Sequence, residues 1–285
     1  MRIERSAEVM KQMNEAMALR AKLIGHLTAS LAPIAKPKKP KTEPPGNSFL
    51  RTIVLSAEGF TPLITSTPLP AVDRACSMFA GPFFTSAAFP IPSNSAGSLL
   101  PIVQLDLREI GQLANRQFGD GLLQLWCDPS WDNESRGLVR LLPREDVADR
   151  RPTAFSYVLN ADASDSPVNE DFIFDPAYGT VRTICGYESV GLQCQGGYLD
   201  VYAEEITEEI WTSIEHDISR FIEVTEHENT LHIFGSFYPI QYSAANVDME
   251  CLVHFPRWGS DGNAQLLYRE VAEGEMVFAF MESLR

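Results

Sequence analysis

Apolar residues recur at helical spacing near the start of the chain. Between residues 4 and 32 they are separated by three, four or seven positions and so face one side of a helix, at Val9, Met13, Met17, Ile24, Leu27 and Leu31. This pattern predicts an amphipathic helix over residues 1–32. The methionines allow the stripe to pack on its own domain or on a partner, so a homodimer through this helix is an open alternative.

Residues 33–47 break the helical pattern with prolines and lysines. The run PIAKPKKPKTEPPGN holds four lysines and one glutamate, a composition typical of an extended, solvated linker. Residues 48–285 form the predicted main domain, where short apolar runs alternate with Gly, Pro and Ser, as strands and turns do. The clearest strands are predicted at 52–55, 102–105, 122–126 and 138–142.

Two runs in this domain, LLPIVQLDL at 99–107 and GLLQLW at 121–126, are apolar at consecutive positions. A strand of this kind is buried on both faces, so helices are expected to cover the sheet. The predicted fold class is therefore α+β, with mainly antiparallel sheet units, covering helices and an N-terminal helix.

The main domain also contains a weak internal repeat. MFAGPFF is followed by LLPIVQLDL and then GDGLLQLWCD, and near the C-terminus IFGSFYPIQ is followed by MECLVHF and then DGNAQLLYRE. Each set has an aromatic segment with glycine, an apolar strand, a glycine turn and a second apolar strand. This order predicts a duplicated sheet unit with residues 161–229 between the two copies.

At these residues the chain resembles the YwqG-like family of unknown function. FAGPFF stands where the family has a Gly-Gly-x-Pro aromatic turn, LLPIVQLDL aligns Gln104, Asp106 and Leu107, and GLLQLW matches a G-x-L-x-F-F run. The match covers residues 77–140 and 231–280. The chain departs from the pattern at Ala80 and Ser236, where paired glycines are expected, and it lacks the Trp-Pro that usually follows the first turn.

The resemblance implies an α+β fold with duplicated sheet units and a distant likeness to programmed-cell-death-two proteins, which act as chaperones of ribosomal proteins. Some members of the family lie beside interbacterial toxins and look like their immunity proteins. The family has no agreed catalytic residue, so the resemblance assigns none to this chain.

Charge is concentrated in one part of the chain. Residues 161–229 contain sixteen acidic residues and two basic ones, a net charge of −14 out of −15 for all 285 residues. Residues 1–46 carry nine bases and four acids, a net charge of +5. A pI near 4.7 argues against direct binding of nucleic acid, because phosphate binding needs clustered Lys and Arg. An acidic segment of this kind favours a basic protein partner instead.

Within the acidic segment, residues 204–224 have the pattern of a helix. Four isoleucines at i, i+4 spacing, Ile206 to Ile218, form its apolar stripe, and the acids in its first turns oppose the positive end of the helix dipole. The dipole is a sufficient structural reason for the first four acids, for which contact with a partner is the alternative, and it does not explain the other acids of the segment, which are expected to face a partner. The predicted partner-binding residues are Glu204, Glu205, Glu208, Glu209, Glu215, Asp217, Glu223, Glu226 and Glu228.

No residue pattern predicts a catalytic or metal site. The pairs His227/His232 and Cys251/His254 are too few for a site, and positions 251 and 254 of a regular strand face opposite sides. The glycine-rich run at 186–198 has no basic residue to hold a phosphate and is expected to be a turn or bulge. We therefore predict no enzyme activity, no metal and no cofactor, while an unrecognised pocket stays an alternative.

The remaining features concern the cellular compartment. Five scattered cysteines without a C-x-x-C pair indicate reduced thiols, and residues 1–22 lack the pattern of a secretory signal. No run approaches the ~20 apolar residues of a membrane span. We expect a cytoplasmic immunity protein that neutralises a toxin, such as a nuclease, through its acidic surface. The alternative is a chaperone for a basic ribosomal or nucleic-acid-binding protein.

Overall fold

The computed structural model describes residues 2–11, 13–15, 58–72, 74–94, 97–128, 137–147, 151–153, 180–192, 231–235, 249–258, 262–272 and 274–283. The chain divides into two compact units. Unit 1 comprises Met1–Ile3, Pro62–Tyr187 and Pro239–Arg285, and unit 2 comprises Glu4–Thr61 and Glu188–Tyr238. The described part is mostly antiparallel sheet with few helices.

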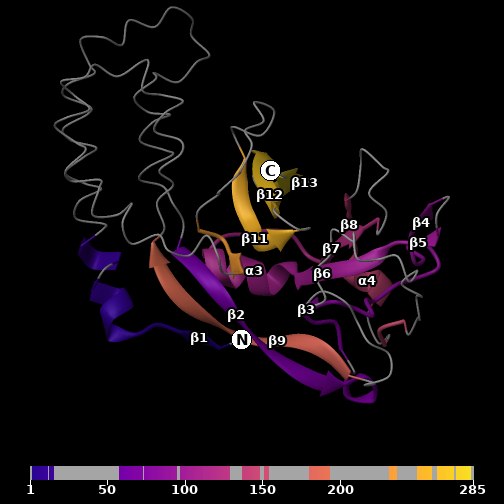
Figure 1. The fold of residues 1–285 in the computed structure, drawn as a ribbon, viewed down its shortest axis with the longest axis horizontal. Coiled ribbons are helices and arrows are strands. Elements are labelled where there is room, and N and C mark those ends of the chain that lie inside the picture. Colours follow the sequence, from indigo (N-terminus) through magenta and orange to yellow (C-terminus); the bar gives the residue numbers. More distant parts are fainter. Residues whose placement is uncertain are drawn as a thin grey trace, which may run out of the picture. The chain divides into compact units, whose positions relative to one another are not determined.

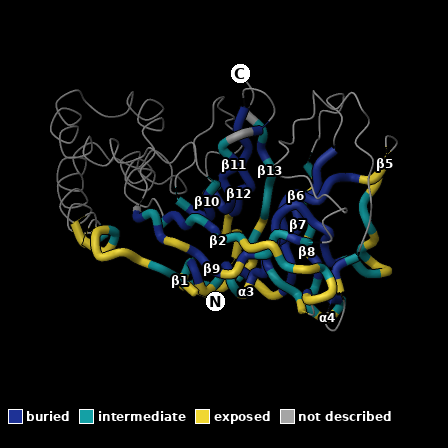
Figure 2. The backbone as a smooth tube through the Cα atoms, turned by 60° about the horizontal axis from the view of Figure 1, so that its bottom comes forward, coloured by how far each residue is buried: buried dark blue, intermediate teal, exposed yellow. Residues whose placement is uncertain are grey.

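Three strands of unit 1 form an antiparallel meander. They are β6 (Leu100–Asp106), β7 (Leu122–Cys127) and β8 (Gly137–Leu142), and β7 pairs with both neighbours (Figure 1). Every residue of β6 and β7 is buried, whereas β8 is only partly buried (Figure 2). The strands predicted at 102–105, 122–126 and 138–142 are therefore confirmed.

Helix α3 (Leu107–Ala114) directly follows β6. Asp106 caps its first turn by accepting a hydrogen bond from the backbone N–H of Arg108, and Asn115 ends it in the left-handed conformation, with φ 52° and ψ 40°. The buried side chains of the helix are Leu107, Ile110 and Leu113, the spacing of a single helix face.

The short strand β3 (Met78–Phe79) pairs with the edge of β6 that does not face β7. It pairs antiparallel with β6 and with β9 (Thr180–Leu192), and β9 also neighbours β2 (Glu58–Pro68) and β1 (Ile3–Glu4). Strand β9 lies inside the acidic segment, and it includes residues 186–192 of the run at 186–198 that was expected to be a turn or bulge. The prediction of a turn was wrong for residues 186–192, because they continue an extended strand, in which Gly191 has a positive φ of 85°. Residues 193–198 lie outside the described residues.

The C-terminal part of unit 1 is a second antiparallel meander. It consists of β11 (Glu250–Trp258), β12 (Gly262–Ala272) and β13 (Glu275–Ser283). A Cβ added to Gly137 on β8 would lie 2.1 Å from Cδ1 of Phe280 on β13, so these two strands pack closely. Position 137 needs a glycine because any larger side chain would overlap the Phe280 ring.

Unit 2 contributes few described residues. Phe60 in β2 pairs with Ile233 in β10 (His232–Ile233), and Glu58 accepts hydrogen bonds from Arg5 at 2.7 and 2.9 Å. Residues 7–11 and 13–15 are helical, which covers a small part of the helix predicted over 1–32. Residues 2–6 are described and are not helical, so the helix predicted over 1–32 was wrong at its start, because Ile3–Glu4 form strand β1, which pairs with β9. Residues 16–32 of that prediction, the linker at 33–47 and the strand predicted at 52–55 lie outside the described residues.

The smaller elements all belong to unit 1. They are the turn of 3-10 helix η1 (Leu69–Ala71), the hairpin β4 (Ser93–Asn94) with β5 (Gly97–Ser98), and the single-turn helix α4 (Arg144–Val147). Among the described helices, none is long and apolar enough to cross a membrane.

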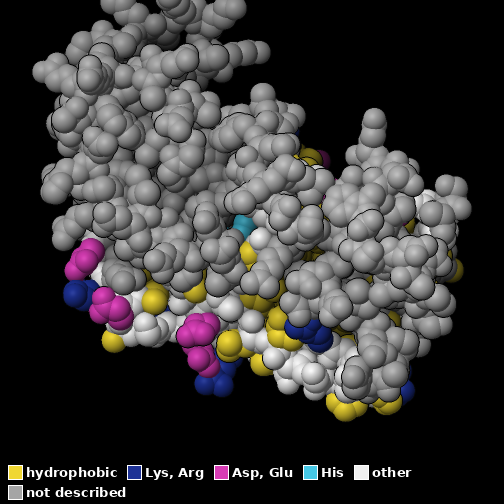
Figure 3. Space-filling model, viewed as in Figure 1, with side chains coloured by type: hydrophobic (Ala, Val, Ile, Leu, Met, Phe, Trp, Pro, Cys, Tyr) yellow, Lys and Arg dark blue, Asp and Glu magenta, His cyan; other side chains and the backbone are white. Residues whose placement is uncertain are grey.

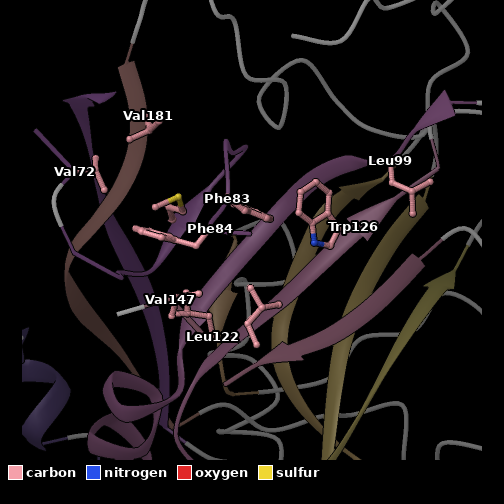
Figure 4. Packing of buried hydrophobic residues seen from close by; sticks show 10 residues of the cluster. Val72, Phe83, Phe84, Leu99, Leu122, Trp126, Val147 and Val181 are labelled. Atoms are coloured by element: carbon pink, nitrogen blue, oxygen red, sulfur yellow. The ribbon is translucent and has the colours of Figure 1, made fainter. Parts of the chain in front are cut away.

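One hydrophobic cluster of unit 1 joins the meander to the segment after β3. Figure 4 shows Phe83 and Phe84 beside Leu122 and Trp126, with Val181 of β9 completing one side. Phe83 meets the Trp126 ring edge-on, at 5.2 Å between centroids and an interplanar angle of 80°. These contacts place the FAGPFF segment against one face of β6 and β7.

The two aromatic-glycine segments of the predicted repeat share an unusual backbone conformation. After β3, Ala80 and Gly81 have φ of 54° and 38°, and after β10, Phe234 and Gly235 have φ of 59° and 82°. Two consecutive residues in the left-handed region are uncommon outside glycine. The shared geometry is what duplicated units would produce, and the duplication itself stays a prediction.

Candidate functional site

The nine predicted partner-binding residues, from Glu204 to Glu228, all lie outside the described residues. Of the acidic segment at 161–229, the structure describes residues 180–192 only. There the acidic Glu188 is exposed and the basic Arg182 is half-buried.

Four charged side chains around the start of α3 in unit 1 form ion pairs. Arg144 contacts the Asp106 carboxylate and lies 2.7 Å from Asp120, and Arg108 lies 2.7 Å from the other oxygen of Asp120. The hydrogen bond from Arg108, together with that from Arg144, lowers the pKa of Asp120. These pairs tie the start of α3 to α4.

The pair Cys251 and His254 does not follow the regular alternation that was predicted. Cys251 pairs with Leu267 and His254 with Gln265, because a register shift after Cys251 adds one residue to β11. The two side chains therefore share a face of the sheet, and the prediction of opposite faces was wrong. Both are buried, and burial raises the pKa of the Cys251 thiol, which disfavours the thiolate that a metal prefers.

No cluster of three or more His, Cys, Asp or Glu side chains suited to a metal ion occurs within the part of the chain that the structure describes. His232, one half of the pair His227/His232, is fully buried, and His227 lies outside that part.

Two buried glutamines form a connected polar group among the described residues of unit 1. Gln104 of β6 donates to the carbonyl of Cys76 at 2.8 Å and accepts from the backbone N–H of Phe84 at 3.2 Å. Gln124 of β7 donates to the Phe84 carbonyl and to Gln104, each at 2.7 Å. The two side chains thereby hold the backbone of the FAGPFF segment against the sheet.

Arg140 of β8 completes this glutamine network. Its Nε donates to Gln124 Oε1 at 2.9 Å, its Nη1 donates to the Pro90 carbonyl at 2.6 Å, and its guanidinium lies 5.0 Å from the centre of the Trp126 ring. Trp126 Nε1 also donates to Gln124 Oε1, at 3.0 Å. Desolvation lowers the pKa of Arg140 to about 10, which leaves it protonated at neutral pH.

A second buried polar group surrounds Ser77. Its hydroxyl donates to Glu109 Oε2 at 2.7 Å and accepts from the backbone N–H of Asp106 at 2.9 Å. Burial raises the pKa of Glu109, although the hydrogen bond from Ser77 opposes the shift. Ser77 has no accessible surface, so this arrangement fixes the start of α3 and does not present a nucleophile.

Arg140 and Glu109 were not singled out from the sequence. The signal for Arg140 was an arginine inside the apolar run GLVRLL, where a charged side chain must either reach solvent or find buried partners. Glu109 had no comparable signal, because an acid in the first turn of a helix is common on exposed surfaces.

A scan against protein-family models finds no match for the chain, and a search of curated proteins finds none either. The function is therefore inferred from charge, from the resemblance in the sequence and from the geometry above.

Proposed function

We propose that this chain is a cytoplasmic binding protein without catalytic activity, an immunity protein that neutralises a toxin by covering its substrate-binding site. The toxin proposed is a nuclease, because the phosphate-binding cleft of such an enzyme is basic and an acidic surface competes with its substrate there. The proposed contact residues are the acids at 204–228.

The observation that carries this proposal is the separation of charge along the chain. Residues 161–229 have a net charge of −14, whereas the rest of the chain contains twenty-two acids and twenty-one bases and is close to neutral. On the face shown in Figure 3, the described acidic side chains occur beside basic ones and form no continuous acidic patch. Unbalanced like charge destabilises the folded protein through self-repulsion. The same charge accelerates association with a basic partner.

The described polar groups support a binding protein over an enzyme. The buried glutamines, Ser77 and Glu109 are each engaged by the backbone or by a neighbouring side chain, and they hold segments of unit 1 in place. The resemblance to the YwqG-like family points in the same direction, since that family has no agreed catalytic residue.

A second function is favoured by the distant likeness to programmed-cell-death-two proteins. The same acidic segment would shield a basic ribosomal protein, or another nucleic-acid-binding protein, during assembly. The two functions differ in their partner and in its fate, because a chaperone releases its client, while an immunity protein keeps the toxin inactive.

The product of the neighbouring gene provides the test. Its nuclease activity is measured on plasmid DNA and on total RNA, with and without equimolar chain. The proposal predicts inhibition through a stable complex that excludes nucleic acid. An active nuclease that this chain neither binds nor inhibits contradicts it, and a ribosomal protein as the stoichiometric partner favours the chaperone.

A further inference from the structure

The two meanders of unit 1 (Figure 1) carry a β-bulge at the same position. Ile102 in β6 and Leu252 in β11 are each the extra residue of a register shift, and both are fully buried. In each strand a valine follows, and the residue after the valine pairs with a glutamine of the next strand. These pairs are Gln104 with Gln124 and His254 with Gln265. A bulge is a specific local feature of a sheet, so its repetition matches the two meanders residue for residue.

The strands that precede the two meanders are also paired in the same way. Phe79 in β3 pairs with Arg182 in β9, and Ile233 in β10 pairs with Phe60 in β2. Phe79 and Ile233 each directly precede two residues in the left-handed region. Arg182 and Phe60 are each the third residue of their strand. Strands β2 and β3 of the first set therefore correspond to β9 and β10 of the second set, and the first strand of each set pairs with the second strand of the other.

The connections between corresponding strands differ in length. Residues 69–77, nine in all, join β2 to β3, whereas residues 193–231, thirty-nine in all, join β9 to β10. The next connection shows that the strands accept such a difference. Residues 107–121 join β6 to β7 and only residues 259–261 join β11 to β12, yet the bulge and the register after it are the same. Closing a longer loop adds little cost, because the entropy lost grows only with the logarithm of its length.

The division into compact units agrees with this comparison. Strand β3 and both meanders lie in unit 1, whereas residues 193–231 lie in unit 2. The hydrogen bonds of Gln104 and Gln124 to the backbone of Phe84 involve no residue of that range, and neither does the described hydrophobic cluster around Trp126. These contacts, which hold the first set of strands together, are therefore independent of residues 193–231.

We infer that residues 193–231 are an insertion into the second copy of a duplicated unit, that the sheet folds without them, and that contact with the partner is confined to them. The range holds ten acidic residues and one basic residue, and it includes all nine predicted partner-binding residues. Connections on a rigid scaffold commonly carry binding function. The part of the inference that concerns the partner rests on the proposed function, while the part that concerns the fold does not.

The test is a variant of the full-length chain in which a nine-residue Gly/Ser linker, as long as the connection at 69–77, replaces residues 193–231. Two buried thiols report whether the sheet is intact, Cys127 in β7 for the first meander and Cys251 in β11 for the second. The exposed Cys185 reports the reaction of an unprotected thiol. Labelling of each thiol by iodoacetamide is followed by mass spectrometry, and the parent chain, native and in urea, is the reference.

We expect Cys127 and Cys251 of the variant to react as slowly as they do in the native parent, at least about a hundredfold more slowly than in urea. A second variant, with a linker of twice that length, excludes strain from a short connection, since the longer loop adds little entropic cost. Fast labelling of either thiol in both variants would show that residues 193–231 are part of the folded sheet, and it would overturn the inference.

The same two variants are then mixed with the product of the neighbouring gene. We expect both to lose binding and inhibition of its nuclease activity, whereas the parent retains them. A protected variant that still binds and inhibits like the parent would overturn the placement of the contact, and with it the proposed contact residues at 204–228. If the parent itself does not bind this product, the proposed function fails, while thiol labelling still decides whether residues 193–231 are an insertion.

Discussion

Gln104 and Gln124 face each other across β6 and β7, and Gln124 Nε2 donates to Gln104 Oε1 at 2.7 Å. Gln124 uses its full capacity, because both N–H groups donate and its oxygen accepts from Trp126 and Arg140. A fully satisfied buried group of this kind specifies one arrangement of the chain around it.

Replacement of Gln124 by leucine should therefore be costly. It removes the donor to the Phe84 carbonyl and the acceptor of Trp126 Nε1 and Arg140 Nε, and each buried group left unpaired costs about 1–3 kcal/mol. Gln104→Leu should cost a similar amount, and the double variant should cost less than the sum of the two, since the glutamines act on one network. Urea unfolding of the four proteins measures these differences, and strictly additive costs would contradict the network.

The close approach of Gly137 and Phe280 predicts that Gly137→Ala changes the free energy of unfolding in opposite directions with and without the Phe280 ring. Alanine for glycine in a strand normally stabilises by about 0.5–1 kcal/mol. Here the new Cβ would lie 2.1 Å from the Phe280 ring, so Gly137→Ala should instead destabilise by about 2 kcal/mol.

In a Phe280→Ala background the same change should become neutral or stabilising, because the ring is gone. The two variants are compared by the free energy of unfolding in a double-mutant cycle. A Gly137→Ala effect that is independent of Phe280 would show that β8 and β13 do not pack as described.

The burial of Glu109 predicts that the stability of the fold depends on pH. Its folded pKa is raised above the ordinary 4.5 by burial, so the folded state binds this proton more tightly than the unfolded state does. The group therefore stabilises the fold most below the unfolded pKa, and this contribution is lost as pH rises through the folded pKa. Glu109→Gln should make the protein more stable than the parent near neutral pH.

The difference between parent and Glu109→Gln should disappear at about pH 4, where both side chains are neutral. The amide of the substituted side chain still offers an oxygen to the Ser77 hydroxyl, so the hydrogen bond at that position survives the change. Urea unfolding at both pH values checks the sign. A variant that is less stable at neutral pH would mean that Glu109 is favoured as a carboxylate in the fold.

The apolar runs predicted the central strands because burial on both faces leaves a signal in consecutive residues. Strand β9 has no such apolar run, since TVRTICGYESVGL mixes polar and apolar residues. The register shift in β11 arises from its pairing with β12 rather than from local sequence. The buried contacts of Arg140 could not be predicted, because its partners Gln124, Trp126 and Pro90 are distant from it in the sequence. The acidic residues at 204–228 remain a prediction from charge.

We propose that the acids beyond the first turns of the predicted helix, at 215–228, recognise a basic partner. Two variants of the chain separate this from a general effect of charge. The test variant reverses four acids of the segment to lysine: Glu215, Asp217, Glu226 and Glu228. The control variant reverses four exposed glutamates outside it: Glu8, Glu15, Glu145 and Glu275.

Each variant changes the net charge by the same amount, eight units, from −15 to −7. Association of each protein with the purified product of the neighbouring gene is followed by stopped-flow fluorescence at low and high salt. We expect the test variant to associate at least about tenfold more slowly than the parent and to lose most of its salt dependence, while the control variant stays close to the parent. Equal association rates for the test and control variants would contradict it.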